Sequence, residues 1–459
     1  MAKRLIFNAF AMNSVSHVYH GLWRRDDTAQ VRFNDLSTWI EVAKIAERGR
    51  FDALFFADII GVDPVYKGSW DTFLTETVQI PVNDSFTLVA ALVGATENLG
   101  LTFTSSILQA HPFDLARKVS TLDHLSKGRV GWNIVTSVSH NAAQNFGFDR
   151  IVPHDERYRW AHEYVDVVYK LWEGSWDEDA LVEDRQRNFY ADPGKVHRIF
   201  HESERYKVLG PHLTTPSPQR TPVLFQAGSS KAGRAFAAKN AEGTFIVSKN
   251  PDGARRLVNE VRGQVAAAGR DPHDLLFIQG MAFVVGSTEE EARRKARDLA
   301  EDISLDGLAA HISRDLGVDL GLLDPDRPID EAEIEGVQGL VRVFQEAHPG
   351  QRPTVRDLAS AYALNAQVIG TPEQIADQLE LWRDAGIDGV NVIYHTLPGS
   401  FAEFADHVMP VLRQRGLAQQ DYAPGTYRER LFQGRGPRIN ERHPAARYRG
   451  AFTPARAAA

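Results

Sequence analysis

Eight short apolar runs, separated by helix-like segments, constrain the fold of this chain more than any other feature of its sequence. The runs are almost continuously apolar, as expected for parallel strands that are buried on both faces. Strands that alternate with helices predict repeated βα units. We therefore expect the α/β class and a TIM (β/α)8 barrel, with strands at residues 5–10, 53–58, 99–105, 130–136, 222–227, 243–247, 276–285 and 389–394.

Capping residues predict where the intervening helices begin. Asp35, Asp84 and Thr371 each precede a helical pattern, and proline follows Thr371 at the first helical position. Proline is favoured there because its missing N–H would be unpaired in any case. Pro112 begins a further helix, and residues 155–172 form another.

Two long segments interrupt the alternation of strands and helices. Residues 171–221 come after the fourth predicted strand, and residues 303–365 come after the seventh. Because the loops that follow barrel strands surround the active-site mouth, we interpret both segments as lid and pocket wall. We expect one barrel domain over residues 1–414, and a C-terminal extension, 415–459, that packs on the barrel or on a neighbouring subunit.

Composition narrows the possible functions. The net charge is −8 and no basic run precedes the tail, so nucleic acid is not an expected partner. The absence of cysteine excludes disulfides, iron–sulfur clusters and cysteine nucleophiles. The sequence has no signal-peptide pattern, and no apolar stretch approaches the roughly 20 residues that span a bilayer. We expect a cytoplasmic protein with no membrane partner.

The segment KGRVGWNIVTS, residues 127–137, is the most informative local motif. It predicts a loop, a buried strand and polar groups at the carboxyl end of that strand, where barrel enzymes place their chemistry. The buried amide of Asn133 needs a hydrogen-bonding partner, since an unpaired one costs about 1–3 kcal/mol. A polar layer inside the barrel and a bound ligand are the two explanations.

Other predicted strands also end in polar side chains. Asp58 ends the second strand, where a helix cap, a loop salt bridge or a ligand contact would explain it. Thr104 and Ser105 close the third strand. Their hydroxyls can bond a cofactor ring, but serines at strand ends often bond only the backbone.

The segment QAGSSKAGR, residues 226–234, predicts a strand that ends in small residues and a helix that begins at two serines. Free N–H groups at a helix N-terminus bind anions, and Gly228 permits a close approach. An ordinary serine N-cap is the alternative. The segment matches neither the Walker A loop nor the Rossmann fingerprint.

These motifs, with Asn145-Phe146-Gly147 and the HDERY sequence of residues 154–158, closely resemble the FMN-dependent monooxygenases of the bacterial luciferase superfamily. The resemblance covers nearly the whole chain. It is nearest to the nitrilotriacetate and dibenzothiophene sulfone monooxygenase group, and within it to the long-chain alkane and dimethyl sulfide enzymes.

The resemblance implies the oxygenase component of a two-component system. A separate NAD(P)H:flavin reductase would supply reduced FMN (FMNH2), and a flavin peroxide would deliver one oxygen atom of O2 to a small organic substrate. The chemistry would be the cofactor's own, and the protein would hold the flavin and exclude water. Relatives are usually dimers or tetramers, so the resemblance also implies a homodimer or homotetramer.

The resemblance assigns flavin-binding residues as well. In relatives, the positions of Asp58, Asn133 and Ser137 lie along the flavin, and Tyr158 contacts its phosphate with the segment after the fifth strand. With the strand-end hydroxyls included, the predicted cofactor-binding residues are Asp58, Thr104, Ser105, Asn133, Ser137, His154, Tyr158, Ala227, Gly228, Ser229 and Ser230.

Two histidines follow the first predicted strand. His17 and His20 have a spacing that suits a metal, but no third ligand is clustered with them, so we expect no metal site. A proton donor near neutral pH or a pocket wall is the better interpretation. His17 and His311 correspond to cavity histidines in the similar alkane enzymes, and Gln79 is a further candidate. We predict that His17, Gln79 and His311 are catalytic.

The substrate is less constrained than the cofactor. Ser14, Asp63 and Val138 stand where the alkane enzymes have a cysteine, a tyrosine and a histidine that face substrate. An alkane, an organosulfur compound or a halogenated or aromatic compound is expected, because several aromatic residues near the barrel mouth indicate an apolar pocket: Phe10, Phe55, Phe56 and Phe103.

Two other functions remain open from the residues alone. The same fold supports deazaflavin-dependent hydride transfer, against which the motif of the fourth strand and Tyr158 argue. It also supports non-catalytic flavin binding, against which the cavity histidines and the second long insertion argue.

Overall fold

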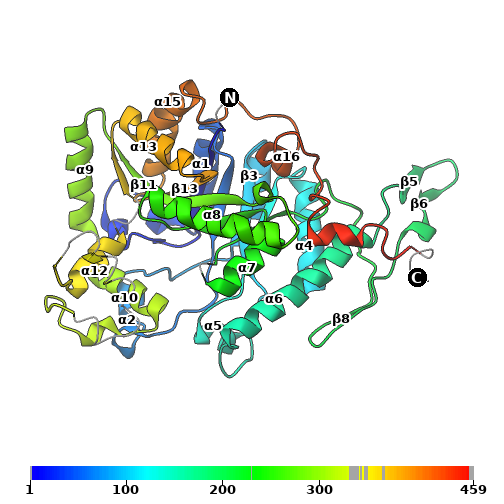
Figure 1. Cartoon of the computed structure of the whole chain (residues 1–459), viewed down its shortest axis with the longest axis horizontal. Coiled ribbons are helices and arrows are strands. Elements are labelled where there is room, and N and C mark those ends of the chain that lie inside the picture. Colours follow the sequence, from blue (N-terminus) through cyan, green and yellow to red (C-terminus); the bar gives the residue numbers. More distant parts are fainter. Residues whose placement is uncertain are drawn as a thin grey trace.

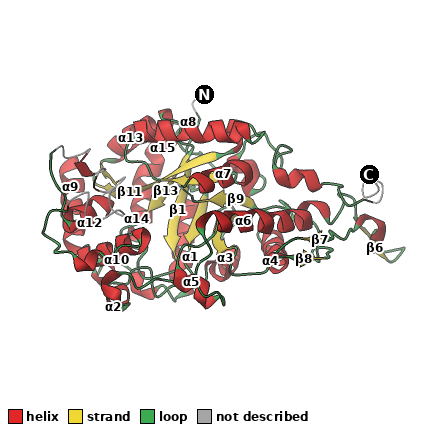
Figure 2. Ribbon diagram, turned by 60° about the horizontal axis from the view of Figure 1, so that its bottom comes forward, coloured by secondary structure: helices red, strands yellow, loops and turns green. Residues whose placement is uncertain are grey.

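Eight parallel strands close into a barrel at the centre of the molecule (Figures 1 and 2). The computed structural model describes residues 3–228, 230–329, 341, 344–345, 350–363 and 367–453. The strands pair in the order β10-β9-β4-β3-β2-β1-β13-β11, and β11 pairs with β10 to close the ring. The predicted TIM barrel is therefore confirmed. Its strands are β1 (Ile6–Met12), β2 (Ala53–Ala57), β3 (Gly100–Ser106), β4 (Val130–Val135), β9 (Val223–Gln226), β10 (Gly243–Ile246), β11 (Leu276–Val285) and β13 (Gly389–Ile393).

Helices surround the barrel on all sides in Figure 2. Asp84 and Thr371 accept N–H bonds as the caps that the sequence predicts, whereas Asp35 precedes its helix without a side-chain cap bond. The helices are α1 (Leu36–Arg48), α2 (Asp71–Thr75), α3 (Ser85–Leu92), α4 (Pro112–Leu125), α5 (His140–Asn145), α6 (His154–Tyr169), α7 (Lys231–Asn240), α8 (Pro251–Ala267), α9 (Glu289–Asp302), α10 (Leu305–Leu316), α12 (Val355–Ala363), α13 (Pro372–Asp384), α14 (Gly399–Glu403), α15 (Met409–Gln414) and α16 (Tyr427–Leu431).

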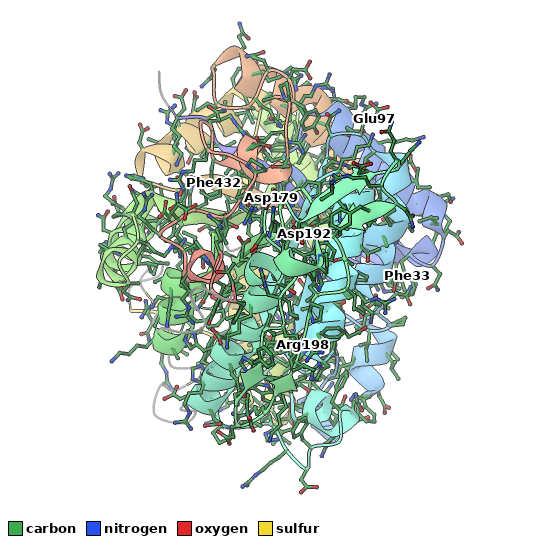
Figure 3. The ribbon with its side chains drawn as sticks, turned by 90° about the vertical axis from the view of Figure 1, so that its right-hand side faces the viewer. Phe33, Glu97, Asp179, Asp192, Arg198 and Phe432 are labelled. Atoms are coloured by element: carbon green, nitrogen blue, oxygen red, sulfur yellow. The ribbon has the colours of Figure 1, made fainter. Side chains whose placement is uncertain are left out.

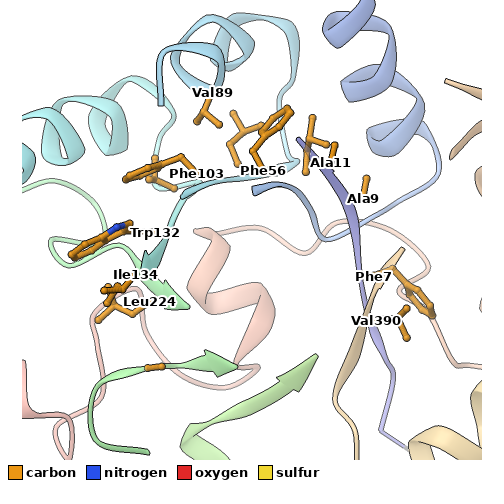
Figure 4. Packing of buried hydrophobic residues seen from close by; sticks show 14 of the residues in the cluster. Phe7, Ala9, Ala11, Phe56, Val89, Phe103, Trp132, Ile134, Leu224 and Val390 are labelled. Carbon is orange, nitrogen blue, oxygen red and sulfur yellow. The ribbon is translucent and has the colours of Figure 1, made fainter. Parts of the chain in front are cut away.

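Strand side chains alternate between two apolar layers. Phe7, Ala9 and Ala11 of β1 belong to the outer layer, where the barrel packs against its helices (Figure 4). Ile6 and its inward-facing counterparts on other strands form a separate inner cluster. Because successive side chains point to opposite faces of a strand, two apolar layers require nearly continuous apolar runs.

Phe56 and Phe103 lie in the outer layer, so their prediction as pocket residues is wrong. Phe56 packs against Trp39 of α1, with ring centroids 5.2 Å apart, and Phe103 packs against Phe86 of α3 at 5.0 Å. Phe55, one residue earlier, faces the interior. The sequence identified an aromatic pair at the end of β2, but only one member of such a pair can face inward.

The first insertion follows α6, in agreement with its predicted bounds and with the predicted helix of residues 155–172. It forms two small antiparallel hairpins, β5 (Leu181–Asp184) with β6 (Phe189–Ala191), and β7 (His201–Glu202) with β8 (Lys207–Val208). Its last part reaches the amino end of β4, where the Gln219 amide donates to the carbonyl oxygen of Val130 at 3.0 Å. The hairpins project from one side of the barrel (Figure 1), and Arg205 of the insertion bonds Glu156 in the first turn of α6.

The C-terminal segment closes the amino end of the barrel. Tyr427 and Leu431 of α16 pack with Ile6 and Phe55 in the inner cluster. Phe432, which follows α16, lies on the same side of the molecule as the first insertion (Figure 3). Contacts within the chain thus cover that end of the barrel, opposite to the mouth.

The second insertion extends the other end of the molecule. Its α10 packs with loops that follow β1 and β2, and a second apolar cluster contains Tyr19, Phe73 and Leu308. A further strand, β12 (Gln367–Gly370), pairs in parallel with the second half of β11 and was not predicted. Among the described residues, no helix has the length and apolar character needed to cross a bilayer.

Candidate active site

The carboxyl ends of the barrel strands meet in an aromatic mouth. The ring of Phe10, near the end of β1, lies 5.5 Å from Phe55 and 5.5 Å from Phe245, centroid to centroid. His17, in the loop after β1, packs edge-on against Phe10 at 4.7 Å. Three strands therefore place apolar rings beside a buried imidazole at this end of the barrel.

One side of the mouth contains a group that we call the anion cradle, consisting of Tyr158, Gly228, Ser230 and Gly233. Ser230 is the N-cap of α7, and its hydroxyl oxygen accepts the N–H of Gly233 at 3.0 Å. The same oxygen lies 3.0 Å from His154 Nε2, at the start of α6. The sequence predicted this meeting of two helix N-termini, where free N–H groups favour an anion.

The two glycines of the cradle allow the Tyr158 hydroxyl to lie against the backbone. A Cβ atom would stand 3.0 Å from Tyr158 Oη if placed on Gly228, and 2.7 Å from it if placed on Gly233. Either side chain would displace the phenol from the helix N-terminus. Ala227, before the cradle, is exposed, and Ser229 lies outside the described residues.

Asn133 and Thr104 form part of a polar layer inside the barrel. The Asn133 amide donates to Thr104 Oγ1 at 2.9 Å, and the Thr104 hydroxyl donates to the carbonyl oxygen of Phe56 at 2.7 Å. This chain links β4, β3 and β2. The structure thus places Asn133 in a polar layer, which is the first of the two explanations. A ligand would bind to the hydrogen-bonding groups of its amide that remain free to accept or donate. Ser105 is also buried, but it lies on the opposite face of β3 from Thr104, because successive strand side chains alternate.

Ser137 and Asp58 also bond within the chain. Ser137 has a left-handed backbone, with φ of 55°, and its hydroxyl lies 2.8 Å from that of Ser106. The Asp58 carboxylate accepts the N–H of Ser85 at 3.0 Å, at the beginning of α3. Burial, which outweighs this bond, raises the pKa of Asp58 to about 6.

A second polar group, here called the histidine cluster, contains His17, His20, Gln79, His311 and Arg314. The Gln79 amide donates to the carbonyl oxygen of His17 at 2.9 Å and accepts from Arg314 at 2.7 Å. His20 Nε2 lies 2.8 Å from His311 Nδ1. The three predicted catalytic residues therefore come together. They are joined by His20, which the sequence indicated with His17 as a proton donor or pocket wall, and by Arg314, which was not predicted.

The histidines of this cluster are neutral at physiological pH. Burial, with a smaller effect from the Arg314 cation, lowers the pKa of His17 to about 3. Burial also holds the pKa of His20 and of His311 well below the usual value. These imidazoles can therefore donate or accept hydrogen bonds, but they do not carry a positive charge.

Two of the three positions that differ from the alkane enzymes have structural roles. The Asp63 carboxylate caps α5, where it accepts from Ser139 Oγ and from the N–H groups of His140 and Asn141 at 2.7 to 3.0 Å. Ser14 Oγ donates to a backbone carbonyl two residues later. Val138 is exposed beside the mouth. Within the described residues, no three His, Asp or Glu side chains are grouped as metal ligands.

Comparison with known proteins identifies the family. The model of the luciferase-like monooxygenases matches residues 12–389. This chain belongs to that family. The dimethyl-sulfide monooxygenase of Hyphomicrobium sulfonivorans is 41% identical over 456 residues, which are 98% of this chain and 95% of the relative. The long-chain alkane monooxygenase of Geobacillus thermodenitrificans strain NG80-2 is 42% identical over 450 residues, 98% and 99% of the two chains.

The fold agrees with the family assignment. The solved structure of DmoA from Hyphomicrobium sulfonivorans matches with a TM-score of 0.92 at 41% identity, over 98% of this chain and 97% of that one. The protein is a flavin-dependent monooxygenase, as the sequence resemblance implied.

The anion cradle of this monooxygenase fits the phosphate of a flavin nucleotide, and a buried arginine supports the fit. Arg157 precedes Tyr158 and is only 7% exposed. Its Nε has no hydrogen-bond partner in the described part of the chain. Burial lowers the pKa of Arg157, and the neighbouring Tyr158 opposes that shift. A buried guanidinium nitrogen without a partner is costly, and a bound phosphate that reached it would remove the cost.

Sequence reasoning did not single out Arg157 or Arg314. Arg157 belongs to the HDERY motif. A basic residue on the side of a helix that is expected to be buried was the feature that could have indicated a site residue there. Arg314 follows His311 on α10 by three residues, a spacing that places both on one helix face. No local pattern indicated that α10 would meet the loop after β1.

Proposed function

We propose that this protein is the oxygenase component of a two-component, FMNH2-dependent monooxygenase. It inserts one oxygen atom of O2 into a small apolar organic substrate, such as an alkane, an organosulfur compound or a halogenated or aromatic compound. The observation that carries the proposal is the anion cradle beside an aromatic mouth at one end of the barrel.

The roles of the residues follow from this arrangement. Reduced FMN, when bound, supplies the electrons that activate O2. The cradle and Arg157 would hold its phosphate, while Asp58, Asn133 and Ser137 would contact the ring system. The aromatic residues of the mouth would exclude water from the reacting atoms.

The histidine cluster would form the substrate side of the site. His17, Gln79 and His311 are buried, so their hydrogen bonds are stronger than those of groups in water. Since the imidazoles are neutral, they would orient the substrate and donate hydrogen bonds to the oxygen being transferred. Among the described residues of the histidine cluster, the cation is Arg314, which already bonds Gln79 and Asp315.

We also propose a separate NAD(P)H:flavin reductase as the source of reduced FMN, and a homodimer or homotetramer as the assembled enzyme. A reductase with NAD(P)H should be replaceable by chemically reduced FMN if flavin transfer is its only contribution. Analytical ultracentrifugation would determine the assembly.

Turnover with isotopically labelled O2 tests the function. Purified protein, reduced FMN and a panel containing an alkane, a dialkyl sulfide and an aromatic sulfone should yield one product with a single labelled oxygen atom. Under the same conditions, protein should slow the reaction of reduced FMN with O2 relative to free FMN. Unlabelled products throughout, with reduced FMN oxidised as fast as in buffer, would contradict the proposal. Tighter binding of a deazaflavin than of FMN would favour hydride transfer.

A further inference from the structure

Two histidines in the cluster form a direct, buried pair. His20 Nε2 and His311 Nδ1 are 2.8 Å apart, and the two residues are 0% and 4% exposed. The pair is rigid because the loop containing His20 packs closely against the start of α10. The carbonyl oxygen of His20 accepts the N–H of Ser304 at 2.9 Å, and a Cβ on Gly307 would stand 2.8 Å from His20 Cβ.

A neutral pair of this kind has only two hydrogen-bonding states. One facing nitrogen must carry the hydrogen and the other must present its lone pair. The choice at His311 Nδ1 also fixes the opposite nitrogen of the same ring, because a neutral imidazole has one N–H. The contact with His20 therefore controls which chemical group His311 presents at Nε2.

Asp315 favours one of the two states. A carboxylate oxygen of Asp315 lies 3.5 Å from His311 Nε2, and that carboxylate also accepts from Arg314 at 2.7 Å. An ionised carboxylate only accepts, so it stabilises a hydrogen on His311 Nε2 and disfavours a lone pair there. His311 Nδ1 then accepts the hydrogen of His20 Nε2.

We propose that Asp315 and His20 together hold His311 in its Nε2–H tautomer, with His20 as a positioning residue that donates to Nδ1. His311 then acts in the site as a hydrogen-bond donor and not as a base. The catalytic consequence rests on the proposed function, in which His311 belongs to the substrate side of the site. The tautomer itself is a property of the protein without cofactor.

Nitrogen NMR of selectively labelled histidine in the flavin-free protein tests the tautomer directly. We expect His311 in the wild type to show a protonated Nε2 and an unprotonated Nδ1. His20→Gln places an amide N–H at the position of His20 Nε2 and should preserve this pattern. His20→Leu removes the donor at 2.8 Å with little change in volume and leaves the longer, 3.5 Å contact with Asp315, so it should produce a mixture of tautomers at His311.

Kinetics give a second comparison. Outer-shell groups that orient a functional histidine typically contribute roughly 10- to 100-fold, so His20→Leu should lower kcat by about that factor. KM and FMN affinity should change little, and His20→Gln should recover most of kcat. A merely structural role would lower both variants together and would shift their melting temperatures in parallel. If the leucine variant does not fold, His20→Asn, whose amide is too short to reach His311, replaces it.

Two results would overturn the inference: an Nδ1–H tautomer of His311 in the wild type, or an unchanged tautomer in His20→Leu. Neither measurement depends on turnover. An inactive wild-type protein that shows the expected NMR pattern would contradict the proposed function alone, whereas an active one with the wrong tautomer would contradict the role of His20 alone.

Discussion

Asp58, directly after β2, is partly buried, and Arg157, in the first turn of α6, is buried; the loss of solvent disfavours the charged form of each. Asp58 accepts a backbone N–H from α3, which stabilises its carboxylate only in part. Arg157 has no such compensation at Nε in the described part of the chain. For each residue we therefore predict the effect of a substitution that removes the charge and nearly conserves the shape of the side chain.

Asp58→Asn should change how stability depends on pH. The pKa of Asp58 is about 6 in the folded protein against a usual 3.8, so between these values the folded state binds more protons than the unfolded state. The free energy of unfolding should therefore fall as pH rises from about 4 to about 6. Asparagine retains an acceptor for Ser85 without titrating. Urea unfolding at several pH values should show that the free energy of unfolding of the variant rises relative to that of the wild type between about pH 4 and about pH 6. A constant difference between the two proteins would show that the pKa of Asp58 is not perturbed.

Arg157→Gln should weaken FMN binding and leave riboflavin binding unchanged. Loss of a charge-assisted bond to phosphate removes about 1.5–3 kcal/mol, or roughly 10- to 100-fold in affinity. Flavin fluorescence titrations would measure both ligands. Arg159→Gln is the matched control, since its side chain is 75% exposed on the same helix. Equal losses for FMN and riboflavin would mean that Arg157 supports the fold instead of binding phosphate.

At the scale of elements, the start of α7 shows how a helix is adapted to bind an anion. Glycine inside a helix is normally destabilising by about 0.5–1 kcal/mol relative to alanine. Gly233, in the first turn of α7, is retained where Tyr158 needs the space, whereas Gly263 of α8 has no heavy atom near the position of a Cβ. The two glycines differ in surroundings, not in secondary structure.

Gly233→Ala should therefore destabilise the protein and weaken FMN binding, because the new Cβ meets Tyr158 Oη at 2.7 Å. Gly263→Ala should raise the free energy of unfolding by about 0.5–1 kcal/mol and leave FMN binding unchanged. Thermal unfolding and flavin titration measure both effects. A stabilised Gly233→Ala variant with normal FMN affinity would show that the phenol does not need to lie on this helix turn.

Elements whose signals are local were predictable from the sequence. The eight barrel strands were found because both their faces are buried, and the α7 N-terminus because Ser230 caps it. Contacts between distant segments were not predictable. The meeting of His20 with His311 depends on how α10 packs, and β12 forms only because β11 extends beyond the barrel.

For the molecule as a whole, the C-terminal segment completes the barrel. Arg428 of α16 forms a buried ion pair with Glu242, with Nε 2.7 Å from the carboxylate, at the amino end of β10. Its guanidinium also donates to the carbonyl oxygens of Pro222 and Pro437. This single side chain connects the segment to two barrel strands.

Arg428→Met should destabilise the protein by about 3–5 kcal/mol, because it leaves the Glu242 carboxylate buried and unpaired. Arg447→Met, which removes a 59% exposed partner of Asp166, should change stability by less than about 1 kcal/mol. Urea unfolding compares the two. Similar losses would show that the Glu242 site is hydrated or that the closure of the barrel by α16 contributes little.

The closure of the barrel by α16 also imposes an order on folding. All eight strands precede Tyr427 in the chain, so a ribosome has produced every strand before it produces the helix that covers their amino ends. Until then Ile6, Phe55 and Phe225 lack an apolar cover, and contacts of such long sequence separation form slowly. Between the synthesis of β13 and that of α16, the nascent barrel therefore exposes an apolar opening at its amino end, where chaperones that bind apolar surfaces would act.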